Sequence, residues 1–343
     1  MTTATHHPAT AAEQFAARQH SPLQRVQHVL HSHPTISPAL VLVISFIVFS
    51  IINPRFAQPS SLSLVFQQVA VVGALAVGQT LIILTAGIDL SVGAVTILSM
   101  MVMAKLSEHQ GLPAIPSIII GIVLGTAAGA LNGILVTRVN LPPFIVTLGT
   151  LSVFTALGLL YTGGQGVQGQ DMPDLLNWTG TTFDVGPFRV TTGVVMVVLL
   201  YCVVAYALSQ TAWGRHVYAV GDEPEASRLA GIRVNGVLLS VYTVAGLIFG
   251  ITAWILIGRA GSASPNGLTD ANLESITAVV IGGTSLFGGR GTVFGSLLGA
   301  LIVGVFRSGL SLAGVDDQYR VLAIGILVIS AVAVDQWIRK VRA

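Results

Sequence analysis

The sequence predicts an all-α polytopic integral membrane protein with about ten transmembrane helices. Of its 343 residues, 53% are hydrophobic and 9% are charged, whereas a soluble domain carries roughly a quarter charged residues. The mean hydropathy is +0.81. Apolar stretches of about 20 residues, the length that crosses a bilayer, recur along the chain. The net charge of +2 gives no sign of a nucleic-acid partner, and the single cysteine, Cys202, can form no intramolecular disulfide.

The chain divides into a polar tail and a transmembrane domain. Residues 1–34 hold six of the eight histidines but lack an apolar period, so we expect a disordered cytoplasmic tail. Residues 35–343 form the transmembrane domain. The candidate spans cover about 35–52, 62–86, 90–105, 115–136, 144–161, 190–208, 237–258, 274–287, 293–312 and 319–334. The eighth is short for a full crossing, so a re-entrant segment stays open there.

Lysine and arginine positions predict the orientation, because cytoplasmic loops carry an excess of them. With both termini cytoplasmic, ten lie inside, five lie outside and Arg307 falls within the ninth span. This assignment makes residues 163–189 an outer, periplasmic loop and residues 209–236 a cytoplasmic loop. The outer loop contains Gly164-x-Gly166-x-x-Gly169, which follows a predicted helix rather than a strand, so we interpret it as a flexible linker and not as a dinucleotide site.

A carboxylate lies between the second and third predicted spans. Asp89 lies between Gly87 and Gly93 in otherwise continuous apolar sequence. A charge at membrane depth is costly, and backbone leaves the helix there only where protein or a water-filled cavity receives it. We predict a break between two helices that lines a polar path. A short water-exposed turn, with Asp89 capping the next helix, is the alternative.

Two glycine ladders suggest a duplicated core. Gly121, Gly125, Gly129 and Gly133 recur every four residues in the fourth span, and Gly291, Gly295 and Gly299 repeat the spacing at the ninth. Residues four apart share a helix face, so each ladder predicts close helix packing. Because the two spans are five apart, they run in opposite directions. This fits an inverted repeat of spans two to five and seven to ten, although independent packing gives the same pattern.

The cytoplasmic loop predicts a short helix from Pro224 to Ala230. Proline suits the first turn, Glu225 suits the positive end of the helix dipole, and Gly231 can end the helix. A capped helix on this side could dock a partner. It could equally be an ordinary loop helix on the bilayer surface.

Several motifs carry a resemblance to a known family. Glu225-Ala226-Ser227-x-x-x-Gly231 is similar to the Glu-Ala-Ala-x-x-x-Gly loop of ABC importer permeases, with Ser227 where alanine is usual. Four other segments look like the ribose/xylose/arabinose/galactose-type sugar permeases: Gly78-Gln79-Thr80 with Gly87–Gly93, Leu141–Thr150, Gly214–Gly221 and Gly282–Thr292. The resemblance covers nearly everything from about residue 40 to 340.

The resemblance implies a permease homodimer in the bacterial inner membrane that carries a monosaccharide such as ribose, xylose or fructose. It implies an ATPase with two nucleotide-binding domains and a periplasmic sugar-binding protein as partners. ATP and magnesium would then bind the ATPase, and this chain would hold no cofactor or metal. The residues expected to couple to the ATPase are Gly214, Arg215, Glu225, Ala226 and Gly231. The polar residues that we predict along the translocation path are Gln67, Gln79, Asp89 and Asn132.

Other function classes find less support in the sequence. A phosphate-binding loop needs glycine before lysine, but the only lysines, Lys105 and Lys340, do not follow glycine. An ion-coupled sugar transporter is the alternative, with Asp89, Glu274 and Arg307 as relay groups. An enzyme is not predicted, because no span contains clustered nucleophile, base or metal ligands.

Overall fold

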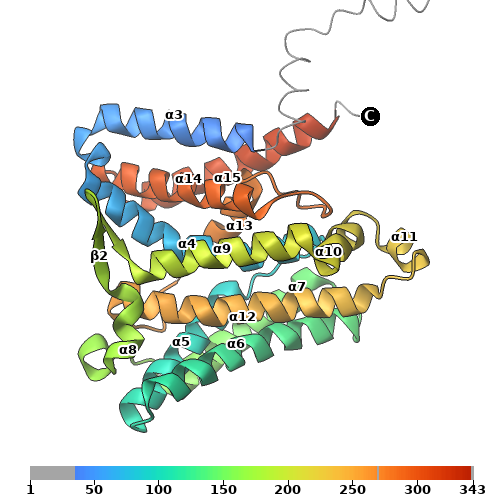
Figure 1. Cartoon of the computed structure of the whole chain (residues 1–343), viewed down its shortest axis with the longest axis horizontal. Coiled ribbons are helices and arrows are strands. Elements are labelled where there is room, and N and C mark those ends of the chain that lie inside the picture. The colour runs from blue at the N-terminus through green and yellow to red at the C-terminus, as the bar shows by residue number, and fades with distance from the viewer. Residues whose placement is uncertain (1–34, 269, 341–343) are drawn as a thin grey trace, which may run out of the picture.

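The computed structural model describes residues 35–268 and 270–340. The predicted tail, residues 1–34, lies outside the described residues. The long helices run side by side in one bundle (Figure 1). In chain order they are α3 Ile36–Ile52, α4 Pro59–Leu84, α5 Val92–His109, α6 Ala114–Thr137, α7 Pro143–Thr162, α9 Thr192–Gln210, α12 Val234–Ala260, α13 Ala271–Ile281, α14 Val293–Leu312 and α15 Asp317–Lys340.

Each predicted span overlaps one of these helices. Within the described residues, six are long and apolar enough to cross a membrane, judged by length and composition: α4, α6, α7, α9, α12 and α14. Among the others, α3 has 17 residues and α13 only 11. The structure therefore supports a multi-pass helical membrane protein, while ten crossings stay a prediction. The eighth predicted span is shortened because α13 ends at Ile281, and Gly283, two residues later, has a φ of 86°.

The outer loop is more ordered than the sequence suggested. It contains the short helix α8 Asp174–Asn177 and a hairpin of β2 Thr182–Val185 with β3 Phe188–Thr191. The two-residue strand β1 Val167–Gln168 pairs with β4 Ser262–Ala263. The interpretation of the Gly164–Gly169 segment as a flexible linker was wrong. A Cβ atom at Gly166 would lie 2.7 Å from the Ala263 carbonyl oxygen, so this glycine lets two backbones meet.

The buried share of each apolar helix distinguishes the inner helices of the bundle from the outer ones. In α4, α12 and α14, more than half of the most apolar stretch is buried inside the molecule, whereas most of it is exposed in α7 and α9. The exposed side chains there include Ile145, Leu160, Val203 and Tyr206. These outer helices present an apolar surface suited to lipid, since lipid tails do not drive such side chains inward.

Both glycine ladders lie at close helix contacts. A Cβ atom at Gly125 would lie 2.8 Å from the Gly246 carbonyl oxygen on α12. On α14, Gly295 and Gly299 pack against the backbone of α13 at Gly282 and Ala278. The helices therefore approach more closely than any larger residue would allow, as small-xxx-small patterns do in membranes. The sequence prediction of close helix packing is confirmed for the first ladder and for Gly295 and Gly299, whereas Gly291 lies in the loop before α14.

Replacing Gly129 with valine should destabilise the bundle. A Cβ atom there would lie 2.8 Å from the Cα atom of Gly246, where only backbone could give way. Overpacking of this kind costs about 1–3 kcal/mol. We expect a lower melting temperature and a lower yield of folded protein in detergent. Gly149→Ala on α7 is the matched control, because nothing lies within 4 Å of its Cβ position. Equal melting temperatures for the two variants would contradict the packing role.

Candidate functional site

Two short helices project from one end of the bundle. They are α10 Ala212–Asp222 and α11 Pro224–Leu229, and both lie opposite the β2–β3 hairpin (Figure 1). The sequence predicted α11 with nearly the observed bounds but missed α10. The missed signal was Thr211, whose hydroxyl caps the helix by accepting a hydrogen bond from the Gly214 amide at 3.2 Å. Val217 and Val220 supply the buried face of α10.

The helix α10 is anchored firmly to the bundle. The indole nitrogen of Trp213 donates a hydrogen bond of 2.8 Å to the Ser240 hydroxyl on α12. Gly214 is buried, and a Cβ atom there would overlap the backbone of Leu208 at the end of α9. Of the two predicted coupling residues on α10, Gly214 thus shapes the tight turn from α9, whereas Arg215 is exposed.

The helix α11 forms the exposed tip of this projection. Glu225 and Ala226 are exposed, and the Glu225 carboxylate pairs with the Arg228 guanidinium at 2.9 Å on the surface. Gly231 ends the segment with a φ of 85°, a conformation that glycine adopts at little cost. Leu229, which the sequence interpretation did not select, is 91% exposed. This leaves an apolar side chain at the tip of the projection free to contact a partner protein.

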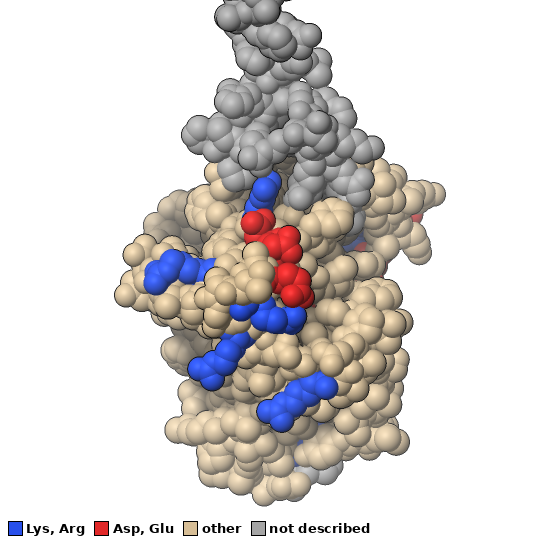
Figure 2. Space-filling view, turned by 90° about the vertical axis from the view of Figure 1, so that its right-hand side faces the viewer, with Lys and Arg blue, Asp and Glu red and all other residues tan. Residues whose placement is uncertain are grey.

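Charged side chains surround this tip. Figure 2, which looks onto the end of the bundle that bears α10 and α11, shows lysine and arginine side chains spread over the face around a group of acidic ones. Excess positive charge marks the cytoplasmic side of membrane proteins.

The end of α10 meets the membrane helices at a cluster that we call the glycine junction: Leu84, Gly221, Gly288, Gly289 and Gly291. The Gly289 amide donates a hydrogen bond of 2.9 Å to the Leu84 carbonyl at the end of α4. A Cβ atom at Gly221 would overlap that same carbonyl. The loop glycines have φ values of 82°, 70° and 143°. The glycine-rich motif between α13 and α14 is therefore needed because three backbones meet in van der Waals contact.

Tyr218 adds a side-chain link at the same place. Its hydroxyl donates a hydrogen bond of 2.9 Å to the Gly291 carbonyl. Burial raises the pKa of Tyr218 above its ordinary value, so the phenol keeps its proton and remains a donor at physiological pH. A displacement of α10 would thus act directly on α4 and on the start of α14.

The predicted break between the second and third spans is present between α4 and α5. Ala86 has a φ of 58°, and a Cβ atom at Gly87 would lie 2.8 Å from the Tyr242 hydroxyl. Asp89 is 1% exposed, so the alternative of a water-exposed turn was wrong. Its carboxylate does order the start of the helix, because it accepts hydrogen bonds from the amide and the hydroxyl of Ser91, each at 2.6 Å.

Three other helices hold this break. Asn132 on α6 donates its side-chain amide to the Ser91 hydroxyl at 2.9 Å. Thr147 on α7 donates to the Ile88 carbonyl at 3.0 Å. The Gly93 amide donates to the side-chain oxygen of Asn272 on α13 at 2.8 Å. The structure therefore brings two of the predicted path residues, Asp89 and Asn132, into one buried network.

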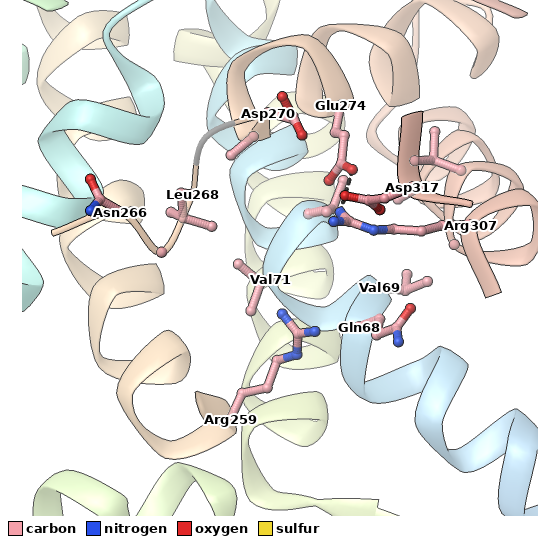
Figure 3. Close-up of a pocket in the computed structure, with 16 residues that line it drawn as sticks. Gln68, Val69, Val71, Arg259, Asn266, Leu268, Asp270, Glu274, Arg307 and Asp317 are labelled. Carbon is pink, nitrogen blue, oxygen red and sulfur yellow. Dashed lines mark hydrogen bonds and ion pairs between the residues drawn. The ribbon is translucent and has the colours of Figure 1, made fainter. Parts of the chain in front are cut away.

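The other two predicted path residues lie elsewhere. Gln79 is fully buried in α4, and its side-chain amide has no hydrogen-bond partner among the described residues. Gln67 lies twelve residues earlier, about 18 Å along the helix axis. It is half-buried, but its neighbour Gln68 lines a cavity of about 440 Å³ (Figure 3). A role of Gln67, Gln79, Asp89 and Asn132 in translocation stays a prediction.

The cavity lies in the half of the bundle nearer the hairpin. It is bounded by α4, α13 and α14, the end of α12 and the start of α15 (Figure 3). Its charged lining residues are Arg259, Asp270, Glu274, Arg307 and Asp317. Glu274 is 4% exposed and accepts a hydrogen bond from the Arg307 guanidinium. The sequence selected Glu274 and Arg307 only as relay groups of the alternative function.

The described part of the chain, with six helices long and apolar enough to cross a membrane, has the architecture of a multi-pass membrane protein. The chain belongs to the family described as "Branched-chain amino acid transport system / permease component", which matches residues 61–332. This family consists of transport permeases, so the chain is a permease component and not an enzyme.

Curated relatives specify the resemblance further. The chain is 50% identical to the fructose import permease protein of Rhizobium meliloti, over 97% of this chain and 94% of the relative. It is 38% identical to the ribose import permease protein of Bacillus subtilis, over 88% and 92%. It is 33% identical to the D-allose transport system permease protein of Escherichia coli, over 88% and 91%. The resemblance to sugar permeases is thus confirmed. No solved structure matches the chain.

Proposed function

We propose that the chain is the membrane-spanning subunit of an ATP-binding cassette importer for a monosaccharide. Two copies form the pathway in the bacterial inner membrane. A separate ATPase with two nucleotide-binding domains docks on α10 and α11. A periplasmic sugar-binding protein delivers the sugar to the end that bears the β2–β3 hairpin.

The observation that carries this proposal is the continuity from α11 to the membrane helices. The exposed tip at Leu229 belongs to α11, which follows α10 directly, and the end of α10 packs against the membrane helices at the glycine junction. A partner that moves α11 therefore moves the end of α4 and the loop before α14. This arrangement serves an external motor. It has no evident use in a transporter that is driven from within the membrane.

The same arrangement supports the orientation. The described chain starts at the end of the bundle that bears α10 and α11, and α15 finishes there (Figure 1). With the ATPase in the cytoplasm, both termini are cytoplasmic, and the hairpin faces the periplasm.

An inverted repeat of ten crossings also finds support in helix pairing. The hydroxyls of Thr80 on α4 and Ser296 on α14 are hydrogen-bonded at 2.7 Å, and Gly125 on α6 packs against Gly246 on α12. The first helix of each half therefore contacts the third helix of the other half. Such interlocked halves are typical of transporters built from inverted repeats.

The ion-coupled alternative finds less support. A relay needs groups that can pass a proton or ion along a chain. Asp89 bonds Ser91, and Glu274 bonds Arg307. No hydrogen bond joins these two groups among the described residues.

Uptake of labelled fructose, ribose and xylose by the reconstituted importer tests the proposal. Fructose is the first sugar to test, because the relative named for its import is 50% identical to this chain. We expect uptake of one sugar that requires ATP, the ATPase and the binding protein together. ATP-dependent uptake of none of the three, or uptake without the ATPase, would contradict the proposed function.

A further inference from the structure

We propose that the charged cavity between α4, α12, α13, α14 and α15 is a receiving site for a neutral sugar on its way through the membrane. In this site the carboxylate of Glu274 and the guanidinium groups of Arg259 and Arg307 bind sugar hydroxyls. The inference rests on the proposed function and deepens it by assigning residues and a class of ligand.

The position of Arg307 indicates that the cavity holds water. Arg307 lies on α14, a helix apolar and long enough to cross the membrane, yet its side chain is 44% exposed. An arginine within a span faces a polar cavity or a partner charge rather than lipid. Both conditions are met here, because Arg307 borders the cavity and pairs with Glu274.

Ion pairing leaves hydrogen-bonding capacity for a ligand. Glu274 is held by Arg307, and Asp317 is paired with Arg320 at 3.2 Å. Arg259 lines the cavity without a hydrogen bond or ion pair among the described residues. Figure 3 shows Arg259 and Gln68 below the Glu274–Arg307 pair, which they face across the cavity. A guanidinium carries five N–H donors and a carboxylate several acceptor positions, which suits neighbouring sugar hydroxyls that both donate and accept.

The charge balance of the wall selects the class of ligand. Among the described residues, two guanidinium groups and three carboxylates line the cavity. Charges of both signs bind neutral hydroxyl groups, whereas a sugar phosphate needs a surplus of cations. The remaining wall is mostly aliphatic, and no described lining residue is aromatic. Without ring stacking the affinity stays low, as conduction requires. The volume falls within the range of about 300–1,000 Å³ for small-molecule sites.

Sugar uptake by the complete importer tests whether Arg259 and Glu274 bind the sugar. The variants are Arg259→Gln and Glu274→Gln, with Arg138→Gln at the exposed position directly after α6 as control, and labelled fructose is the probe. Loss of a charge-assisted hydrogen bond weakens binding by roughly tenfold or more. We expect the KM for uptake to rise by this factor for Arg259→Gln, with partial recovery in Arg259→Lys. ATPase recruitment should be unchanged.

A cysteine-labelling experiment keeps the test valid if Glu274→Gln fails to fold. The single cysteine is replaced by Cys202→Ser, and Val72→Cys then places a thiol in the cavity wall. During turnover, excess fructose should slow its reaction with a water-soluble maleimide, and fructose 6-phosphate should not. Arg138→Cys at the exposed position directly after α6 is the control. Equal labelling with and without fructose in an actively transporting complex overturns the receiving site alone. Absence of sugar uptake by the wild-type complex overturns the proposed function as well.

Discussion

Leu229→Asp should strongly reduce recruitment of the ATPase to membranes that contain the permease. Leu229 is 91% exposed at the tip of α11, so the substitution leaves the fold intact but places a charge where an apolar anchor is expected. An unpaired carboxylate forced into an apolar contact costs about 2 kcal/mol or more, which weakens the Kd roughly 30-fold. Co-sedimentation of the ATPase with membranes, and uptake of fructose by the complex, should fall together.

Two variants control for this result. Leu229→Met conserves volume and apolar character, so recruitment should remain near the wild-type value. Val185→Asp introduces the same charge at an exposed position, 53% accessible, on the opposite end of the bundle. Recruitment of the ATPase should not change there. Unaltered recruitment by Leu229→Asp would remove α11 as the docking element.

Gly221→Ala should uncouple the ATPase from transport. A Cβ atom at this position would overlap the Leu84 carbonyl and lie 2.7 Å from the Gly289 amide nitrogen. Because both contacts are backbone, α10 must shift away from α4. A displacement that costs about 1–3 kcal/mol changes the equilibrium between two conformations by roughly 5- to 150-fold. We expect sugar uptake to fall by such a factor while the ATPase still binds.

The helix propensity of alanine cannot explain a loss of uptake in Gly221→Ala. In an exposed helix, alanine is about 1 kcal/mol more favourable than glycine. Gly236→Ala near the start of α12 is the matched control, because its Cβ position lies 3.7 Å from the Arg233 side chain. Uptake by that variant should match wild type. If Gly221→Ala also transports at the wild-type rate, the glycine junction does not carry the coupling.

The sequence predicted those features that depend on local pattern. The spans followed from apolar length, α11 from Pro224 and Gly231, and the break before α5 from a carboxylate between glycines. It missed α10, since an amphipathic helix of three turns lies within a polar stretch and its Thr211 cap went unnoticed. Leu229 was also missed, because its exposure depends on how α11 projects from the bundle.

Features that require tertiary contacts could not be predicted. Gln67 and Gln68 are adjacent in sequence, but only the packing of α4 decides that Gln68 borders the cavity. The charged lining residues come from four helices and an intervening loop, so no sequence spacing reveals them. The need for glycine at position 221 likewise arises from Leu84 and Gly289, which are distant in sequence.

Uptake by reconstituted vesicles distinguishes an ATP-driven importer from an ion-coupled transporter. The purified permease is reconstituted in vesicles alone or with its ATPase and binding protein, and labelled fructose uptake is measured. We expect uptake only by the complete complex with ATP, and strongly reduced uptake when Leu229→Asp replaces the wild-type chain. Uptake by the permease alone, driven by a proton or sodium gradient, would contradict it.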